Sequence, residues 1–339
     1  MSKVFVGLDY HKDLIQVCMM DSAGAVLANR ACINDSNELA LLVAFFGDAV
    51  EGAIEACSGS ADIADELITR HGWNLSLAHP GYVNRMKQSP DKSDYSDARM
   101  LADLVRVGYL PKVWLAPEDV RQLRTLVRHR QQLVNERRAT KLRVAALLRE
   151  NRVDAGKLRR WTRAWLAWLP TAAGLGSEGL WVVNRHLASL NRLAKEIAEV
   201  ELRLAQVTEE DPVVSQLIAL RGIGLTTAWA LRAEIGRFDR FKSGKQLSRY
   251  CGLSPRNASS GNRQADAGLI KAGSELLRAV IIEAAHRLIR YDQRWKTLAD
   301  SLRRAGKPGS VVAAAVGNRW MRWLYHQVEA GSIELKKAS

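Results

Sequence analysis

The chain has 339 residues, of which 47% are hydrophobic and 25% charged, and its formal net charge is +14. This length accommodates two or three domains with separate cores, in a composition ordinary for a soluble globular protein. No apolar run reaches the roughly 18 residues of a membrane-spanning helix. The first residues lack the pattern of a signal peptide, and the four cysteines lack metal-ligand spacing. We therefore expect a cytoplasmic protein with reduced thiols and no membrane partner.

Charge is distributed unevenly along the chain. Residues 1–117 contain 10 Lys and Arg against 15 Asp and Glu, a balance of −5, whereas the remaining residues contain 40 against 21, a balance of +19. An acidic first part followed by a strongly basic part is expected when one binds cations and the other binds phosphates. A basic surface that serves solubility alone is the alternative.

The first 110 residues predict an α/β domain. Short β-rich runs at 4–8, 15–20 and 25–32 predict three strands. The elements expected after them are a helix at 38–46, a strand at 52–56, a helix at 61–71, a strand at 75–78, a short helix at 82–87 and a helix at 96–107. This order is that of an RNase H-like fold, although other α/β folds share much of it. We assign this domain to residues 1–112.

Two long helices are predicted next, after Pro111 and Pro117. The first spans 118–152 and is rich in arginine. The second begins near residue 180, and its apolar residues alternate spacings of three and four, as in a heptad seam: Leu190, Leu193, Ile197, Val200, Leu204 and Val207. We expect an antiparallel hairpin or a coiled-coil arm over 118–208, and packing within the chain and dimerisation are equally compatible with it. Three tryptophans at helical spacing between the helices favour core or interface packing over base stacking: Trp161, Trp165 and Trp168.

A third, mainly helical region is expected over 212–332. Within it, Gly222-Ile223-Gly224 lies between two apolar helical runs and resembles the turn of a helix-hairpin-helix DNA-binding element. Glycines let the backbone approach a phosphate there, and the next helix offers its free N–H groups. A plain turn between helices fits this short motif equally well.

A polar loop over 251–263 contains a candidate nucleophile. Ser260 precedes Gly261, and Arg256 and Arg263 are close enough in sequence to clamp a phosphate beside its hydroxyl. From residue types alone, a solvated loop that uses Ser and Gly for its turns is the simpler interpretation. A serine nucleophile also needs activation, and this loop has no histidine to act as a base.

Four carboxylates of the acidic part lie at the ends of predicted elements. Asp9 ends the first strand, Glu55 lies at the end of the fourth, and Asp94 and Asp97 are at the start of the last helix, where a spacing of three puts them on one face. Hard divalent cations such as Mg²⁺ prefer carboxylate oxygens and can assist phosphoryl transfer. Each helix acid alone could simply complement the helix dipole. All four together favour a metal site.

Short motifs in a fixed order cover nearly the whole chain and resemble one known family, the DEDD transposases of insertion sequences whose recombinases are guided by a bridge-type noncoding RNA. The matching motifs are Gly7-Leu8-Asp9 with His11-Lys12, Ile54-Glu55-Ala56, Asp94-Tyr95-Ser96-Asp97-Ala98-Arg99, Leu126-Val127-Arg128-His129-Arg130, Gly222-Ile223-Gly224, Gly252-Leu253-Ser254-Pro255-Arg256 and Ser260-Gly261.

The resemblance implies a RuvC-like RNase H-fold domain, a coiled-coil arm and a C-terminal transposase domain. It implies a DNA recombinase that forms homodimers or homotetramers with a guide-type noncoding RNA pairing with donor and target DNA. In the matching motifs, Asp9, Glu55, Asp94 and Asp97 take the acidic roles with Mg²⁺ (or Mn²⁺), and Ser260 takes the role of a nucleophile joined covalently to a DNA phosphate. Nucleic-acid contacts are expected from basic and glycine residues of the second part: Arg124, Arg128, Arg130, Gly222, Gly224, Arg256, Arg263 and Lys271.

Two features leave alternatives open. The stretch between Ser260-Gly261 and Lys271 is about one residue shorter than the family pattern, and the adjacent Ser259 competes for the nucleophile role. A Holliday-junction-type metal-dependent endonuclease would need the four acids and water, with Ser260 only contacting phosphate. A third alternative is a nucleic-acid-binding scaffold whose acidic domain is inactive.

Overall fold

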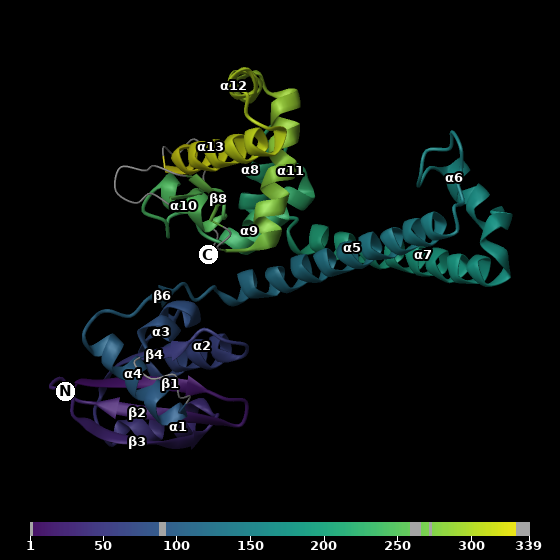
Figure 1. Ribbon diagram of the computed structural model, residues 1–339. Helices are drawn as coiled ribbons and strands as arrows, with labels where there is room; N and C mark the ends of the chain where they lie inside the picture. The colour runs from purple at the N-terminus through teal and green to yellow at the C-terminus, as the bar shows by residue number, and fades with distance from the viewer. Residues whose placement is uncertain (1–2, 88–92, 258–265, 271–272, 330–339) are drawn as a thin grey trace. The chain divides into compact units, whose positions relative to one another are not determined.

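The fold was analysed in a computed structural model, which describes residues 3–87, 93–257, 266–270 and 273–329 (Figure 1). The chain divides into two compact units, Met1–Pro117 and Glu118–Ser339. Each unit is considered by itself below.

The first unit contains a mixed six-stranded sheet in the order β3-β2-β1-β4-β5-β6. Its strands are β1 (Lys3–Tyr10), β2 (Leu14–Met20), β3 (Val26–Ile33), β4 (Ala49–Glu55), β5 (Asn74–Ala78) and β6 (Lys112–Val113). The central strand β1 pairs antiparallel with β2 and parallel with β4, and β4 pairs parallel with β5. The carboxyl ends of β1, β4 and β5 therefore lie at the same edge of the sheet.

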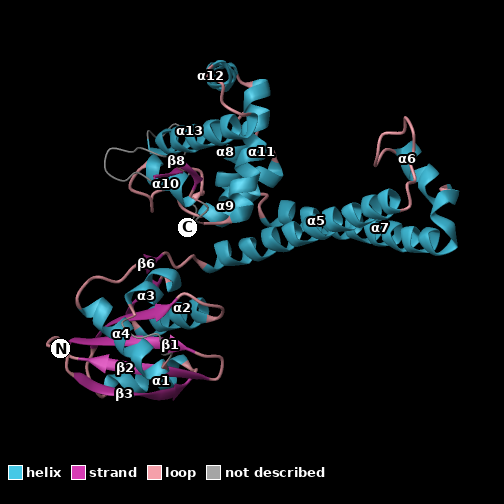
Figure 2. Cartoon of the chain, in the orientation of Figure 1, coloured by secondary structure: helices cyan, strands magenta, loops and turns pink. Residues whose placement is uncertain are grey.

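Helices cover both faces of this sheet (Figure 2). Helices α1 (Ser36–Ala44) and α2 (Ser60–His71) pack on one face, against the alternate β1 residues Val4, Val6 and Leu8. Helices α3 (Pro80–Met86) and α4 (Asp94–Arg106) pack on the other face, against Phe5. Strand alternation thus sends the odd-numbered residues of β1 toward α4.

The expected strands and helices of this unit are present, with shifted ends. Helix α4 begins at Asp94 rather than at Ser96, so both acids of its first turn lie inside the helix. Strand β6 was not predicted, because its two residues are too few to show a periodicity; it pairs antiparallel with β5. The mixed α/β sheet expected for this part of the chain is confirmed.

Two long antiparallel helices begin the second unit, α5 (Glu118–Glu150) and α7 (Gly176–Val207). Leu133 of α5 packs with Leu193 and Ile197 of α7. The seam predicted for α7 is buried over most of its length, but its last residue, Val207, is 45% exposed. The apolar alternation therefore faces the partner helix within the same chain.

The far end of this helix pair has a small core of its own. It includes α6 (Arg163–Trp168) and two single 3₁₀ turns, η1 (Leu169–Thr171) and η2 (Ala173–Leu175). Trp165 is 1% exposed, and its ring centroid lies 4.7 Å from that of Trp161 and 6.1 Å from that of Trp168. Packing, the role favoured for these tryptophans, is confirmed.

The rest of the second unit is mainly helical around one large core. Its helices are α8 (Pro212–Ala219), α9 (Leu225–Ile235), α10 (Gly244–Tyr250), α11 (Glu275–Tyr291), α12 (Gln293–Arg304) and α13 (Gly309–Glu329). Part of the predicted polar loop is instead a two-stranded antiparallel sheet, β7 (Pro255–Asn257) with β8 (Asp266–Leu269). Among the helices that the structure describes, none combines the length and the apolar character needed to cross a membrane.

Candidate active site

Gly7 allows helix α4 to pack directly on the centre of the sheet. A Cβ on Gly7 would overlap the backbone carbonyl of Ala98, so the helix backbone lies against the strand at this point. Asp9 is two residues further along β1 on the same face, and Asp94 and Asp97 lie in the first turn of α4, just before Ala98. This close contact sets the acids of the helix beside the end of β1.

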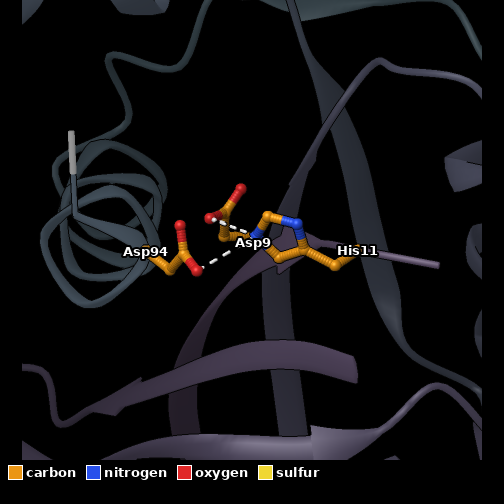
Figure 3. Close-up of side chains that lie close together, drawn as sticks. All are labelled: Asp9, His11 and Asp94. Atoms are coloured by element: carbon orange, nitrogen blue, oxygen red, sulfur yellow. Dashed lines mark ion pairs between the residues drawn. The ribbon is translucent and has the colours of Figure 1, made fainter. Parts of the chain in front are cut away.

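Asp9, Asp94 and His11 form a cluster at this edge (Figure 3). The Nε2 atom of His11 lies 3.4 Å from Oδ2 of Asp9 and 3.2 Å from Oδ2 of Asp94. One ligand atom from each of the three side chains lies within 4.8 Å of the others. His11 was not among the predicted site residues, although its position directly after β1, two residues from Asp9, was a usable signal.

Asp9 is the buried member of the cluster. Its side chain is 13% exposed, against 44% for His11 and 50% for Asp94. Its Oδ2 atom is buried without a hydrogen-bond partner, because the contact with His11 lacks hydrogen-bond geometry. Burial raises the pKa of the Asp9 carboxyl; the charge of His11 opposes this shift, and the charges of Asp94 and Asp97 add to it. A buried carboxylate oxygen of this kind is costly without a cation or donor beside it.

Asp97 has a different partner. Its carboxylate is only 9% exposed and accepts a hydrogen bond from the Nζ of Lys87, at 2.7 Å from Oδ2. Its negative charge still acts on Asp9. Lys87 was not foreseen from the sequence, because nothing in its neighbourhood distinguishes it from any surface lysine. The structure therefore brings Asp97 near the cluster with its charge partly balanced.

Glu55 is close to the cluster but outside it. The last paired residues of β1 and β4 are Leu8 and Ile54, so Asp9 and Glu55 are the next residues of two neighbouring parallel strands. The pKa of the Cys57 thiol is raised mainly by burial, and the carboxylates of Glu55 and Asp9 both raise it further. Both acids are thus within electrostatic reach of the same thiol.

The donor set fits a hard divalent cation. Carboxylate oxygens suit Mg²⁺ and Mn²⁺, whereas an imidazole nitrogen is a poorer ligand for Mg²⁺. The buried Oδ2 of Asp9 has no hydrogen-bond partner to lose, and the exposed Asp94 is open to solvent from which an ion enters. Asp9 and Asp94 are the two residues best placed to hold such an ion.

The three α5 arginines predicted to contact nucleic acid are held by protein groups. The Nε of Arg124 donates to a backbone carbonyl of α9 at 3.0 Å. Arg128 donates two hydrogen bonds to the carboxylate of Glu234, at 2.9 and 3.2 Å, and the Nε of Arg130 donates to Glu201 at 2.8 Å. These bonds use donors that a phosphate would need, so nucleic-acid binding by these arginines stays a prediction.

The glycine motif predicted to be a turn connects α8 and α9. Gly222 has a φ of +84°, a conformation that favours glycine, and Gly224 is the N-cap residue of α9 with open space at its Cβ position. The turn lines a cavity of about 540 Å³ together with the first residues of α9 and with Arg287. Arg287 donates from Nε to the carbonyl of Gly222 at 3.1 Å. Phosphate binding at this turn is compatible with the geometry and stays a prediction.

The remaining predicted residues lie between positions 256 and 271 of the sequence. Arg256 is exposed on β7. Ser259, Ser260, Arg263 and Lys271 lie outside the described residues. The assignment of Ser260 as the nucleophile therefore stays a prediction from the sequence.

Comparison with known proteins gives a consistent result for both parts of the chain. A family model described as "Transposase" (DEDD_Tnp_IS110) matches residues 6–152, and one described as "Transposase IS116/IS110/IS902 family" matches residues 214–300. A putative transposase of Sinorhizobium fredii, y4qE, is 32% identical over 226 residues, which are 65% of this chain and 54% of that protein. The transposase for insertion sequence element IS1111A of Coxiella burnetii is 27% identical over 94% of this chain and 88% of its own length. A probable family 20 transposase of Pseudomonas aeruginosa is 28% identical over 94% and 95%.

Proposed function

The chain belongs to the IS116/IS110/IS902 family of transposases, and from this premise we propose that it is an insertion-sequence recombinase that cuts and exchanges DNA strands at a Mg²⁺-dependent (or Mn²⁺-dependent) acidic site. The observation that carries the proposal is the meeting of Asp9 and Asp94, 85 positions apart in the sequence, around a buried carboxylate oxygen without a hydrogen-bond partner.

The four acids have different roles in this proposal because their environments differ. Asp9 and Asp94 would hold the ion, and Glu55, the neighbouring carboxylate at the end of β4, would add negative charge near it. The hydrogen bond from Lys87 fixes the Asp97 carboxylate at the start of α4, so that Asp97 contributes negative charge at close range. The ion would polarise the scissile phosphate and stabilise the charge that develops on it.

His11 is placed to manage a proton at this site. Its Nε2 contacts the carboxylates of both Asp9 and Asp94. In its imidazolium form it supplies one positive charge between the two acids, and a divalent cation bound by them would displace that charge. Through Nε2, His11 would transfer a proton beside the two acids.

Strand cleavage is proposed to proceed through Ser260. Its Oγ attacks a phosphorus atom of the DNA backbone, forms a phosphoserine ester, and gives up its proton; the bond from phosphorus to the departing strand breaks, and that strand leaves with a free hydroxyl. A hydroxyl of the incoming strand then attacks the phosphoserine, rejoining DNA and restoring the serine. Arg256 and Arg263 would hold the phosphate, and Ser259 is the alternative nucleophile.

The proposal also includes the partners and the domain plan. An RNase H-like (RuvC-like) fold for the first unit is supported by its strand order and by the three antiparallel strands that precede the parallel ones. A coiled-coil arm is supported by the α5–α7 pair, and a guide RNA is supported by the +19 charge balance after residue 117. Dimers or tetramers follow from the family resemblance. Sequencing any RNA that co-purifies from cells carrying the native flanking DNA tests the guide directly.

The acidic site is tested by comparing Asp9→Asn with Asp103→Asn, a control on the same helix as Asp94 but outside the cluster. With full-length protein, its co-purified RNA and DNA bearing the insertion-sequence ends, Asp9→Asn is expected to lower strand cleavage by about 10²-fold or more. Mn²⁺ should raise the Tm of the wild type and of Asp103→Asn, but not of Asp9→Asn. Full cleavage by Asp9→Asn would overturn the proposed role of the acidic site, because strand cleavage would then proceed without it.

The covalent step is tested by trapping protein on DNA under denaturing conditions. The wild type and Ser259→Ala should form a covalent adduct, and Ser260→Ala should form none. The reverse pattern moves the nucleophile by one residue. Free 5′-phosphate products without any adduct would instead establish the water-dependent endonuclease, in which the acids act alone.

A further inference from the structure

The far end of the α5–α7 pair carries a large open cavity of about 840 Å³. It lies between the last turns of α5, from Leu142 to Arg149, and the loop that runs from Arg152 to Arg160. Its floor is apolar and includes Leu148, which is 3% exposed. This cavity belongs to the second unit and shares no residue with the acidic site.

Cations dominate the lining of this cavity. Four arginines line it, Arg143, Arg149, Arg152 and Arg160, against one acid, Asp154. The carboxylate of Asp154 accepts a hydrogen bond from the backbone N–H of Gly156 at 3.1 Å. In the part of the chain that the structure describes, none of the four guanidinium groups has an ion pair or a side-chain hydrogen bond. Four like charges around one cavity repel one another, which calls for an anion to offset them.

Some arginines of the same helix pair have acidic partners. Nearer the main core, Arg130 pairs with Glu201, and on the other helix Arg192 pairs with both Glu136 and Glu196. Residues 137–163, which surround the cavity, contain ten Lys and Arg but only two acids. The cavity therefore lies in a strongly basic stretch with few acids to balance it, as expected of a surface that receives an external polyanion.

The backbone at Arg152 supports this interpretation. Arg152 and Trp161 are the non-glycine residues with positive φ in the described chain, at +55° and +67°. The N–H of Arg152 donates to the carbonyl of Arg149 and that of Val153 to the carbonyl of Leu148, the Schellman pattern that ends a helix. Glycine is the favoured residue at this left-handed position. An arginine there keeps a strained backbone and gains a guanidinium group inside the cavity.

We propose that this arginine-lined cavity binds the phosphodiester backbone of a nucleic acid. The inference rests on the proposed function, since strand exchange is what brings a polyanion to this protein. The basic surroundings extend beyond the cavity along residues 137–163, which fits successive phosphates of a chain better than one small anion. Duplex DNA and folded RNA present the same phosphodiester chemistry, and binding measurements with each distinguish the source.

Arg152→Gly tests the proposal, because glycine relieves the left-handed strain while it removes one cation. The full-length protein carries Asp9→Asn in every sample and EDTA is present, so strand cleavage plays no part. Fluorescence polarisation is measured with labelled duplex DNA and with a labelled RNA hairpin over a range of salt concentrations. We expect an unchanged or higher Tm, with affinity for one of the two nucleic acids about five- to tenfold weaker near 0.1 M salt. The slope of log K against log salt should fall by about 0.9 for duplex DNA, or about 0.7 for a single-stranded contact.

Two further variants separate local from general effects. Arg143→Gln with Arg160→Gln removes two cavity charges without touching the turn, and a loss for the same nucleic acid with a doubled change in slope supports the proposal. Arg192→Gln removes an equal single charge from an ion-paired site and should leave affinity close to wild type. The inference is overturned if the cavity variants have the same affinities and salt slopes as Arg192→Gln for both nucleic acids. It is also overturned if light scattering shows that only the oligomeric state changes. If the protein with an unmutated cavity binds neither nucleic acid, the proposed function is overturned as well.

Discussion

Gly7 of β1 lies directly beneath the carbonyl group of Ala98 in α4, with no side chain between the strand and the helix. A helix usually packs on a sheet through the side chains of both elements. Here the missing Cβ removes that spacer at one point, and the point is two residues from Asp9. The separation between Asp9 and the first turn of α4 is therefore fixed by a glycine that bears no functional group.

Gly7→Ala is expected to damage the site without altering any acidic residue. The new Cβ would meet backbone atoms of α4, which cannot move aside as a flexible side chain would. We expect a loss of roughly 1–3 kcal/mol or more of unfolding free energy in the first unit, and loss of the Mn²⁺-induced rise in Tm. Thermal unfolding with and without Mn²⁺ measures both.

Gly81→Ala in α3 is the matched control, because its Cβ would make only ordinary contact with the His79 ring. It should keep the Mn²⁺ response. A Gly7→Ala protein with wild-type Tm and wild-type metal response would show that α4 can shift freely, and that the close contact does not position the acids.

Asp9→Asn is expected to stabilise the metal-free protein at neutral pH. The folded-state pKa of Asp9 is raised above its ordinary value, chiefly by burial. Ionisation therefore costs stability as the pH rises from the ordinary carboxyl range through the raised pKa, and the cost is complete above it. In EDTA, Tm measured against pH should coincide for wild type and variant at the acid end and diverge in favour of the variant above it.

A divalent cation should make the wild type more stable than Asp9→Asn. Saturating Mn²⁺ stabilises the wild type by binding the folded state, whereas Asp9→Asn has lost a ligand. A Tm difference that is independent of pH, or a variant that is less stable at neutral pH in EDTA, would contradict the burial of an uncompensated carboxylate at Asp9.

Much of the acidic site could be predicted because its residues lie at the ends of regular elements. The alternation in 4–8 indicated β1, and Asp9 follows its last fully buried residue. The spacing of Asp94 and Asp97 indicated one face of a helix start, which holds even though the helix begins two residues earlier than expected. Local periodicity was sufficient for these features because each depends on neighbours only a few residues away.

Other features depended on partners far along the chain. His11 meets Asp94 only because α4 crosses the end of β1, and no local pattern encodes that crossing. The α5 arginines were expected to face phosphate, yet the antiparallel packing of α7 sets Glu201 opposite Arg130. The arginine-lined cavity lies at the far end of the helix pair, where the excess of Lys and Arg was visible in the sequence but the cavity was not.

Labelling of Cys57 should report the charge of the neighbouring acids. Cys57 is an exposed residue, although burial around its sulfur is the main cause of its raised pKa; the carboxylates of Glu55 and Asp9 raise the pKa further, with Glu55 the larger influence of the two. Because the thiolate is the reactive form, removing either negative charge lowers the pKa and speeds alkylation near pH 7. We expect alkylation of Cys57 to be fastest in Glu55→Gln, slower in Asp9→Asn and slowest in the wild type. Mass spectrometry of the labelled peptide measures the Cys57 rate separately from those of the other thiols.

Buried thiols and a remote acid provide the controls. Burial raises the pKa of Cys18 to about 11, so Cys18 should label only after unfolding. Glu51→Gln lies on the same strand as Glu55, in a pair with Lys3, and should leave the Cys57 rate unchanged. Equal Cys57 rates in wild type, Asp9→Asn and Glu55→Gln would mean that the two acids do not act on this thiol.

Arg128→Ala is expected to destabilise the second unit even in the absence of nucleic acid. The side chain of Glu234 is 3% exposed and receives both hydrogen bonds of Arg128, so removing the arginine leaves a buried carboxylate without its charge partner. Since Arg128 itself is 56% exposed, we expect a loss of about 2–3 kcal/mol, below the ~3–5 kcal/mol of a fully buried pair.

Urea unfolding measures this loss of stability, with Arg192→Ala as a control whose exposed pairs contribute about 0–1 kcal/mol. Glu234→Gln combined with Arg128→Ala should recover part of the loss, because the buried charge is gone. Wild-type stability of Arg128→Ala together with weaker DNA binding would instead assign this arginine to a phosphate.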